Sequence, residues 1–200
     1  MLNSLNQYLQ QQGAKQHIKL GDELMFDVET YPNYFLMNFL AGENEVISFE
    51  MRNNKPFTQF QELAFICMNF VIVGFNSNNY DIAMLRHFLS QRATNDSLYN
   101  LSKDIIEYEQ RWYNLRDKYP FNEKININTY DLIEIAPDPN KISLKMYSAR
   151  LSIDKLQDLP YDPHIALTDD EMREVYLYCI KDIKNTLTLR KQLRVEIEMR

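Results

Sequence analysis

Three short β-type runs near the start of the chain constrain the fold more than any other feature. They read LMFDVE, YFLMNFL and EVISFEM, and the turn-prone segments YPN and AGEN separate them. Apolar runs of this length between turn residues are typical of strands joined by tight connections. The sequence therefore predicts an antiparallel meander over residues 24–51.

Helical and strand patterns alternate after the meander. The run FVIVGFN at 70–76 is almost wholly apolar, which is typical of a strand buried on both faces. At Thr168 the motif T-D-D-E predicts a capping box, in which the Thr hydroxyl and the Glu171 carboxylate each satisfy a free backbone N–H. The other expected elements are helices at 57–69, 81–91, 97–116, 143–151 and 168–190, and a strand at 127–135.

This order predicts an α/β fold with a mixed sheet, three antiparallel strands followed by parallel strands, flanked by helices. A hydrophobic content of 45% in 200 residues fits one compact domain. We expect this domain to span residues 21–200, and we expect the Gln-rich and Asn-rich residues 1–20 to be a loosely attached leader. Cys67 and Cys179 lie in apolar stretches and are expected to be reduced core thiols.

The composition also bears on location and partners. No apolar run approaches the roughly 20 residues of a membrane helix, and the polar start lacks a signal peptide, so we expect no membrane association and a cytoplasmic protein. A net charge of −6 and a pI near 5.1 argue against a broad basic face for duplex DNA. They do not exclude nucleic acid, because bound metal ions can screen phosphates near clustered carboxylates.

Acidic residues suggest a metal site. Asp27 and Glu29 are two apart on a predicted strand, so both carboxylates point to one face. Buried unpaired carboxylates are unfavourable unless they meet a cation, and a metal ion is the simplest one to propose. The alternative is an ordinary solvated strand face.

Two further motifs carry acids. The segment FNSNNYD places Asn76, Tyr80 and Asp81 directly after the strand at 70–76, where sites on α/β sheets gather. An Asn-rich turn with Asp81 stabilising a helix start is the structural alternative. Tyr178 and Asp182 are related as i and i+4, so they share one face of the last helix and can border a cleft. A tyrosine four residues before an aspartate is also common by chance.

Together the three motifs resemble the exonuclease motifs of the proofreading domains of family B DNA polymerases, within the DEDD exonuclease superfamily. Asp27-Val28-Glu29 matches D-x-E, Asn76 through Tyr80-Asp81 matches the second motif, and Tyr178 with Asp182 matches Y-x-x-x-D. Leu177 stands where the histidine branch of the superfamily has its His, which indicates the tyrosine branch. The segment SLKMYSARLSIDKLQDLPYDP is similar to phage-encoded DNA polymerases.

The resemblance implies a ribonuclease H-like fold and a 3′→5′ exonuclease that removes nucleotides from the single-stranded 3′ end of DNA during proofreading. It implies two Mg²⁺ or Mn²⁺ ions about 3.5–4 Å apart, which activate a water and stabilise the leaving 3′ oxygen. Tyr178 would orient the attacking water. The expected metal ligands are Asp27, Glu29, Asp81 and Asp182.

The resemblance also implies contacts with DNA. Thr30 and Asn76 would contact the terminal nucleotides, and Tyr80 or Tyr31 would offer a surface for base stacking. Lys145 is the candidate phosphate contact, with an ordinary solvated lysine as the alternative. We expect Asp131 to have a structural role and His164 to lie outside any metal site.

Two other functions fit the same motifs. One is an RNA-trimming exoribonuclease of the same tyrosine branch, and the other is a non-catalytic exonuclease-fold module used for assembly. The final segment TLRKQLRVEIEMR still has a helical pattern. We therefore expect the chain to be a domain of a longer DNA polymerase or a subunit that docks on one, in the bacterial host cytoplasm if it is phage-encoded.

Overall fold

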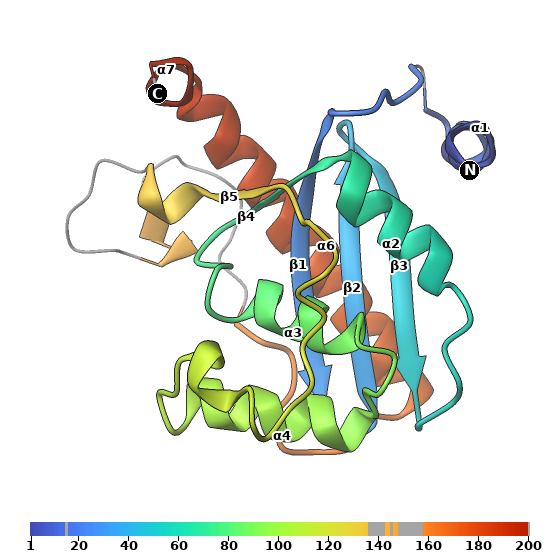
Figure 1. Cartoon of the computed structure of the whole chain (residues 1–200). Helices are drawn as coiled ribbons and strands as arrows, with labels where there is room; N and C mark the ends of the chain where they lie inside the picture. The colour runs from blue at the N-terminus through green and yellow to red at the C-terminus, as the bar shows by residue number, and fades with distance from the viewer. Residues whose placement is uncertain (15, 136–142, 145, 148–157, 200) are drawn as a thin grey trace.

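A five-stranded mixed sheet forms the centre of the computed structural model (Figure 1). Its order is β3-β2-β1-β4-β5. The strands β1 to β3 are antiparallel neighbours, whereas β4 runs parallel to both β1 and β5. The predicted meander followed by parallel strands is confirmed. The strands are β1 (Glu23–Tyr31), β2 (Tyr34–Ala41), β3 (Glu45–Arg52), β4 (Val71–Gly74) and β5 (Thr129–Asp131).

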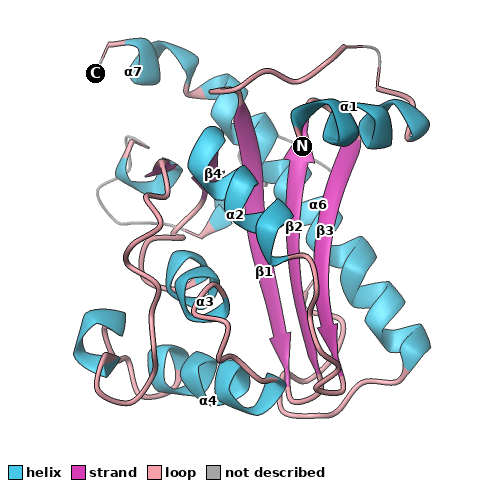
Figure 2. Cartoon of the chain, turned by 45° about the vertical axis from the view of Figure 1, so that its right-hand side comes forward, coloured by secondary structure: helices cyan, strands magenta, loops and turns pink. Residues whose placement is uncertain are grey.

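Helices cover both faces of this sheet (Figure 2). One face packs against α2, α3 and α4, and the other packs against the long helix α6. The structure describes residues 1–14, 16–135, 143–144, 146–147 and 158–199. The helices are α1 (Leu2–Gln11), α2 (Phe60–Asn69), α3 (Asp81–Phe88), α4 (Asn95–Ile106), α6 (Asp169–Gln192) and α7 (Arg194–Glu198).

Strand alternation divides β1 between the two cores. Leu24, Phe26 and Val28 pack on the side of α2, α3 and α4. Tyr31 packs on the side of α6. Because successive side chains alternate, Asp27 and Glu29 share the face that α6 covers. The expected same-face arrangement of the two acids is therefore present.

Two predicted elements are shorter than expected. The helix predicted at 97–116 ends at Ile106, and Glu109 then adopts a left-handed φ of 50°, which cannot continue a right-handed helix. A 3₁₀ turn follows at Trp112–Leu115. The strand predicted at 127–135 is limited to β5, because the Asp131 carboxylate accepts the N–H of Ile133 and starts a 3₁₀ turn at Leu132–Glu134. The predicted helix at 143–151 lies mostly outside the described residues.

The first 20 residues are attached more closely than expected. Leu9 of α1 is 1% exposed and belongs to the main core. The Asn6 amide exchanges two hydrogen bonds with the backbone of Ile18. The Gln12 amide likewise pairs with both the N–H and the C=O of Val46 on the outer strand β3. The expectation of a loose leader was wrong because amide side chains here satisfy backbone groups as a strand would.

None of the helices in the described part of the chain combines the length and the apolar character needed to cross a membrane.

We predict that Leu9→Ala lowers the free energy of unfolding by about 2–5 kcal/mol, because it leaves a cavity in the core. Leu20→Ala is the matched control, since Leu20 is 56% exposed. Urea denaturation of the two variants measures the difference. Equal stabilities would show that α1 does not contribute to the core.

Candidate metal centre

The candidate site begins where β1 is no longer paired with β4 along one edge. β4 pairs with β1 only from Glu23 to Met25. Beyond that point the chain leaves β4, passes through residues 75–80 and enters α3 at Asp81. The Val28 N–H then donates a hydrogen bond to Asp81 Oδ1 over 3.3 Å. The acid of the second motif is thereby held beside the acids of the first.

A buried aspartate fixes the connection between β4 and α3. Asp131 at the end of β5 is 2% exposed and accepts the N–H groups of Asn76 and Asn78 at 2.6 and 3.1 Å. At the start of the loop, a side chain at Gly74 would collide with Ser77, so the tight return requires glycine. These contacts support the structural role that the sequence predicts for Asp131.

Helix α6 supplies the third segment. Its predicted N-cap is confirmed, because Thr168 accepts the N–H of Glu171 and the Glu171 carboxylate accepts the N–H of Thr168. Val175 and Cys179 pack on the sheet face that contains Tyr31. Tyr178 and Asp182 are carried to the edge of this contact.

The carboxyl groups interact strongly with one another. Burial raises the pKa of Asp27 well above its usual range, and the charges of Asp81, Glu29 and Asp182 raise it further. Burial also raises the pKa of Asp81 to about 7, although the backbone N–H groups of Asp81 and Val28 oppose the rise. A hydrogen bond with Asp81 also raises the pKa of Asp27, whereas the same bond lowers that of Asp81. Acids from all three motifs therefore meet at Asp27.

This arrangement fits a divalent cation. A cation placed among the acids would remove their mutual repulsion. Carboxylate oxygens are the ligands that Mg²⁺ and Mn²⁺ prefer. Asp27, Glu29, Asp81 and Asp182 could hold such ions, as the sequence predicts.

The hydroxyl of Tyr178 is close enough to these carboxyl groups to feel their charges. Burial and the charges of Asp182, Glu29 and Asp27 raise the pKa of Tyr178, so its hydroxyl stays protonated at neutral pH. The side chain is 7% exposed and also hydrogen-bonds with Asp182. Tyr178 can therefore donate or accept a hydrogen bond at the site, but it does not act as a base.

The predicted DNA contacts are only partly accessible. Asn76 is exposed with a left-handed φ of 57°, and Tyr80 is partly exposed with its hydroxyl bonded to Ser102. Tyr31 is 1% exposed under α6, so the prediction of a stacking surface was wrong for Tyr31. Thr30 is 7% exposed and its side chain points to the opposite face of β1 from Asp27. The predicted contact of Thr30 with the terminal nucleotides stays a prediction.

Lys145, the predicted phosphate contact, lies outside the described residues. His164 hydrogen-bonds with Tyr99 and lies 3.7 Å from Glu107.

Sequence reasoning missed two neighbours of the acids. Cys179 was expected in the core, and it is fully buried, but its sulfur also lies 3.8 Å from Asp27 Oδ2. Asn38 is the cross-strand partner of Asp27 and is likewise fully buried. A single amide in the otherwise apolar run YFLMNFL was the available signal.

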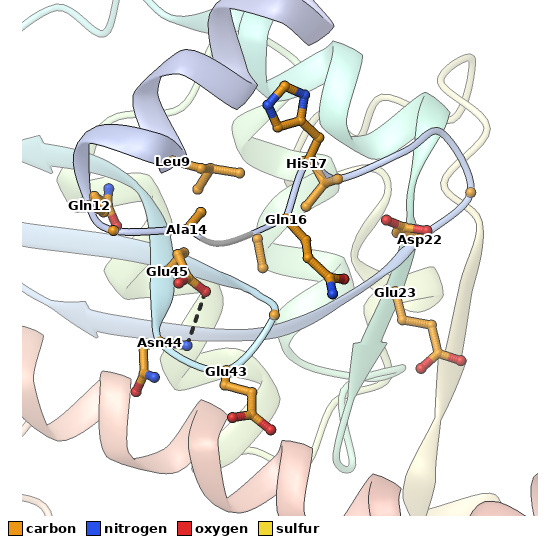
Figure 3. A pocket seen from close by; sticks show the side chains of 15 residues that line it. Leu9, Gln12, Ala14, Gln16, His17, Asp22, Glu23, Glu43, Asn44 and Glu45 are labelled. Atoms are coloured by element: carbon orange, nitrogen blue, oxygen red, sulfur yellow. Dashed lines mark hydrogen bonds between the residues drawn. The ribbon is translucent and has the colours of Figure 1, made fainter.

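A separate cavity lies between α1, the entry to β1 and the turn between β2 and β3 (Figure 3). It has a volume of about 890 Å³ and several acidic side chains. Glu23 pairs with Arg190 and Glu43 pairs with Lys191, so two of these charges are already balanced. We assign this cavity to the packing of the leader against the sheet.

The chain matches no protein-family model, no curated protein and no solved structure.

We predict that the metal-free protein loses stability as the pH rises from about 4 to about 7. The folded-state pKa of Asp81 is about 7, above the usual value of about 4 for an unfolded chain. In this window the folded state binds more protons than the unfolded state, so the free energy of unfolding falls with pH. Urea denaturation in a chelator at several pH values measures it.

Asp81→Asn should flatten this dependence and stabilise the metal-free protein at pH 8 by at most about 4 kcal/mol, since the rise is about three pKa units and each corresponds to about 1.4 kcal/mol. Mg²⁺ should stabilise the wild type more than this variant. Asp117→Asn, at an exposed acid, is the control. A stability that rises with pH across the window would contradict the prediction.

Proposed function

We propose that the protein is a metal-dependent 3′→5′ DNA exonuclease of the tyrosine branch of the DEDD superfamily, acting in proofreading. One observation carries the proposal: the charges of Asp81 and Asp182, which are far from Asp27 in sequence, both act on the Asp27 carboxyl. Each of the three motifs therefore contributes a charge to the surroundings of Asp27. If the three motifs had occurred in the sequence by chance, nothing would require the fold to bring their acidic residues together.

The fold supports the same proposal. Three antiparallel strands followed by two parallel strands, with helices on both faces, are compatible with a ribonuclease H-like sheet. The candidate site lies where β1 parts from β4, and open α/β sheets commonly bind ligands beyond strand ends. We propose the ribonuclease H-like assignment on this basis.

The acids would hold two hard divalent ions, Mg²⁺ or Mn²⁺. When bound, such ions activate a water for attack on a phosphodiester and stabilise the charge on the leaving oxygen. Asp27 and Glu29 would provide ligands from β1, Asp81 from the start of α3, and Asp182 from α6. Because these ligands come from elements packed on one sheet, little reorganisation is needed to collect them.

Tyr178 would position the attacking water. Its hydroxyl stays protonated at neutral pH, because burial and the neighbouring carboxylates raise the pKa of Tyr178. A neutral hydroxyl can fix the orientation of a water through hydrogen bonds without removing its proton. The proton of the attacking water would then pass to solvent or to a carboxylate of the site.

The substrate would be a single-stranded 3′ end. The acidic chain has no excess of basic residues for a duplex, and exposed Asn76 with partly exposed Tyr80 offers an amide and a ring near Asp81. The preference for DNA and the polymerase partner rest on the resemblance of the motifs to family B polymerases.

We predict that the protein releases nucleotides from a 3′-labelled single-stranded DNA in Mg²⁺ or Mn²⁺, and that chelation stops the reaction. Asp27→Ala with Glu29→Ala should lower the rate by at least about 10³-fold, because charge stabilisation by bound metal is lost. Glu109→Ala with Asp117→Ala is the matched control, since it removes one Glu and one Asp from exposed positions.

Activity that persists in the Asp27 and Glu29 double variant would overturn the assignment. An RNA oligomer of the same sequence is run in parallel. Faster cleavage of RNA would favour the exoribonuclease reading, and no cleavage of either would favour the non-catalytic module.

We also predict that Tyr178→Phe lowers kcat by about 10- to 100-fold while Mn²⁺ affinity changes little, because the hydroxyl orients water without holding the ion. Tyr176→Phe, two residues away on the same helix, is the control. Rapid-quench kinetics and calorimetric Mn²⁺ titration measure the two quantities. A parallel loss of Mn²⁺ binding would show that Tyr178 supports the ligands instead.

A further inference from the structure

A thiol lies against the inner side of the acidic cluster. Cys179 on α6 places its sulfur 3.8 Å from Asp27 Oδ2 and 4.0 Å from the Asp27 carbonyl oxygen. One ligand atom each from Asp27, Glu29 and Cys179 can be chosen so that all three lie within 4.8 Å of one another. The cluster therefore combines two hard oxygen donors with one soft sulfur donor.

A second observation points into the same place. Asn38, opposite Asp27 on β2, is fully buried, and neither polar atom of its side chain has a hydrogen-bond partner of normal geometry among the described residues. The Asn38 amide lies beside the Cys179 sulfur. An unpaired buried amide costs about 1–3 kcal/mol. The fold thus keeps beside the sulfur a buried amide that makes no hydrogen bond of normal geometry with the described residues.

The distances fit a small tetrahedral ion. Zinc binds thiolate at about 2.3 Å and carboxylate oxygen at about 2.0–2.2 Å, which places neighbouring ligands about 3.5 Å apart. The observed separation of 3.8 Å between sulfur and Oδ2 needs only a small adjustment. Hard ions such as Mg²⁺ would leave the sulfur unused.

We propose that Asp27, Glu29 and Cys179 form a binding site for a thiophilic divalent cation of the Zn²⁺ class. On binding, the thiol proton passes to solvent and a metal–sulfur bond forms, with no change of oxidation state. The Asn38 N–H groups then face the metal-bound sulfur and lose their unpaired state. The site shares Asp27 and Glu29 with the proposed Mg²⁺ or Mn²⁺ centre, so a thiophilic ion excludes the hard ions from it.

Cd²⁺ is the probe, because its bond to a thiolate produces a charge-transfer absorption in the ultraviolet. Titration of the full chain with Cd²⁺ in a reductant without thiols should give a band that saturates near one equivalent. Cys179→Ser should abolish the band, whereas Cys67→Ser should retain it. Cys67 is the matched control because it is an equally buried free thiol in the other core.

A band that persists in Cys179→Ser, or that is absent from the wild type, overturns the proposal. If Cys179→Ser fails to fold, Asp27→Asn keeps the sulfur and decides the question. It should weaken Cd²⁺ binding by at least about 10-fold, because it replaces a charged ligand. Unchanged affinity in Asp27→Asn would count against the site.

Asn38→Leu separates a role in metal binding from a role in folding. It should raise the melting temperature of the metal-free protein, since an unpaired amide is replaced by an apolar side chain. It should also weaken Cd²⁺ binding by about 10-fold, because the partner of the sulfur is lost. Full Cd²⁺ affinity in Asn38→Leu would assign Asn38 to packing alone and overturn its part in the site.

If the protein is the proposed nuclease, a thiophilic ion at this site should inhibit it, and this expectation rests on the proposed function. Cd²⁺ or Zn²⁺ should stop Mg²⁺-dependent cleavage in the wild type at concentrations that leave Cys179→Ser active. The spectroscopic test needs no nuclease activity. A Cd²⁺ band in a protein that cleaves nothing would therefore overturn only the proposed function, and an active nuclease without the band would overturn only this inference.

Discussion

The parting of β1 from β4 is the constraint on which the rest of the site depends. If β4 stayed paired beyond Met25, its backbone would occupy the edge of β1 beside Val28. Because β4 ends at Gly74, the Val28 N–H is left for the Asp81 carboxylate. A buried N–H without a partner is costly, so this hydrogen bond serves the fold as well as the site. The Asp81 carboxylate therefore has two roles: it accepts the free N–H at the edge of the sheet, and it belongs to the acid cluster.

Apolar packing brings the charged groups of α6 to this edge. Fully burying a Val or Ile side chain stabilises the fold by about 1.5–3 kcal/mol, and Val175 and Ile183 are both fully buried. Asp182 lies beside them on the same helix, so the packing of this helix brings its carboxylate close enough to interact with Asp27. The charge of Asp182 raises the pKa of Asp27, which reflects the repulsion between these acids. Packing therefore outweighs the electrostatic cost of gathering acids.

The parts of the fold that could be predicted follow from fixed local periods. Strand alternation places Asp27 and Glu29 on one face, and the i, i+4 spacing places Tyr178 beside Asp182. The capping box at Thr168 is equally local. The burial of Tyr31 could not be predicted, because alternation gives its face but not the helix that covers it. The attachment of α1 was missed because the amides of Asn6 and Gln12 bind distant backbone groups.

Asn38 shows why part of the site could not be predicted from the sequence pattern. Every residue of β2 is buried, and folding alone would favour an apolar side chain at position 38. Its amide gains no hydrogen bond of normal geometry within the described chain, so its cost of about 1–3 kcal/mol is not offset by the sheet. Its neighbours across the strand and on α6 are Asp27 and Cys179, which belong to the cluster. The cost is best assigned to the site, since a bound cation would convert the adjacent sulfur into the acceptor that the amide lacks.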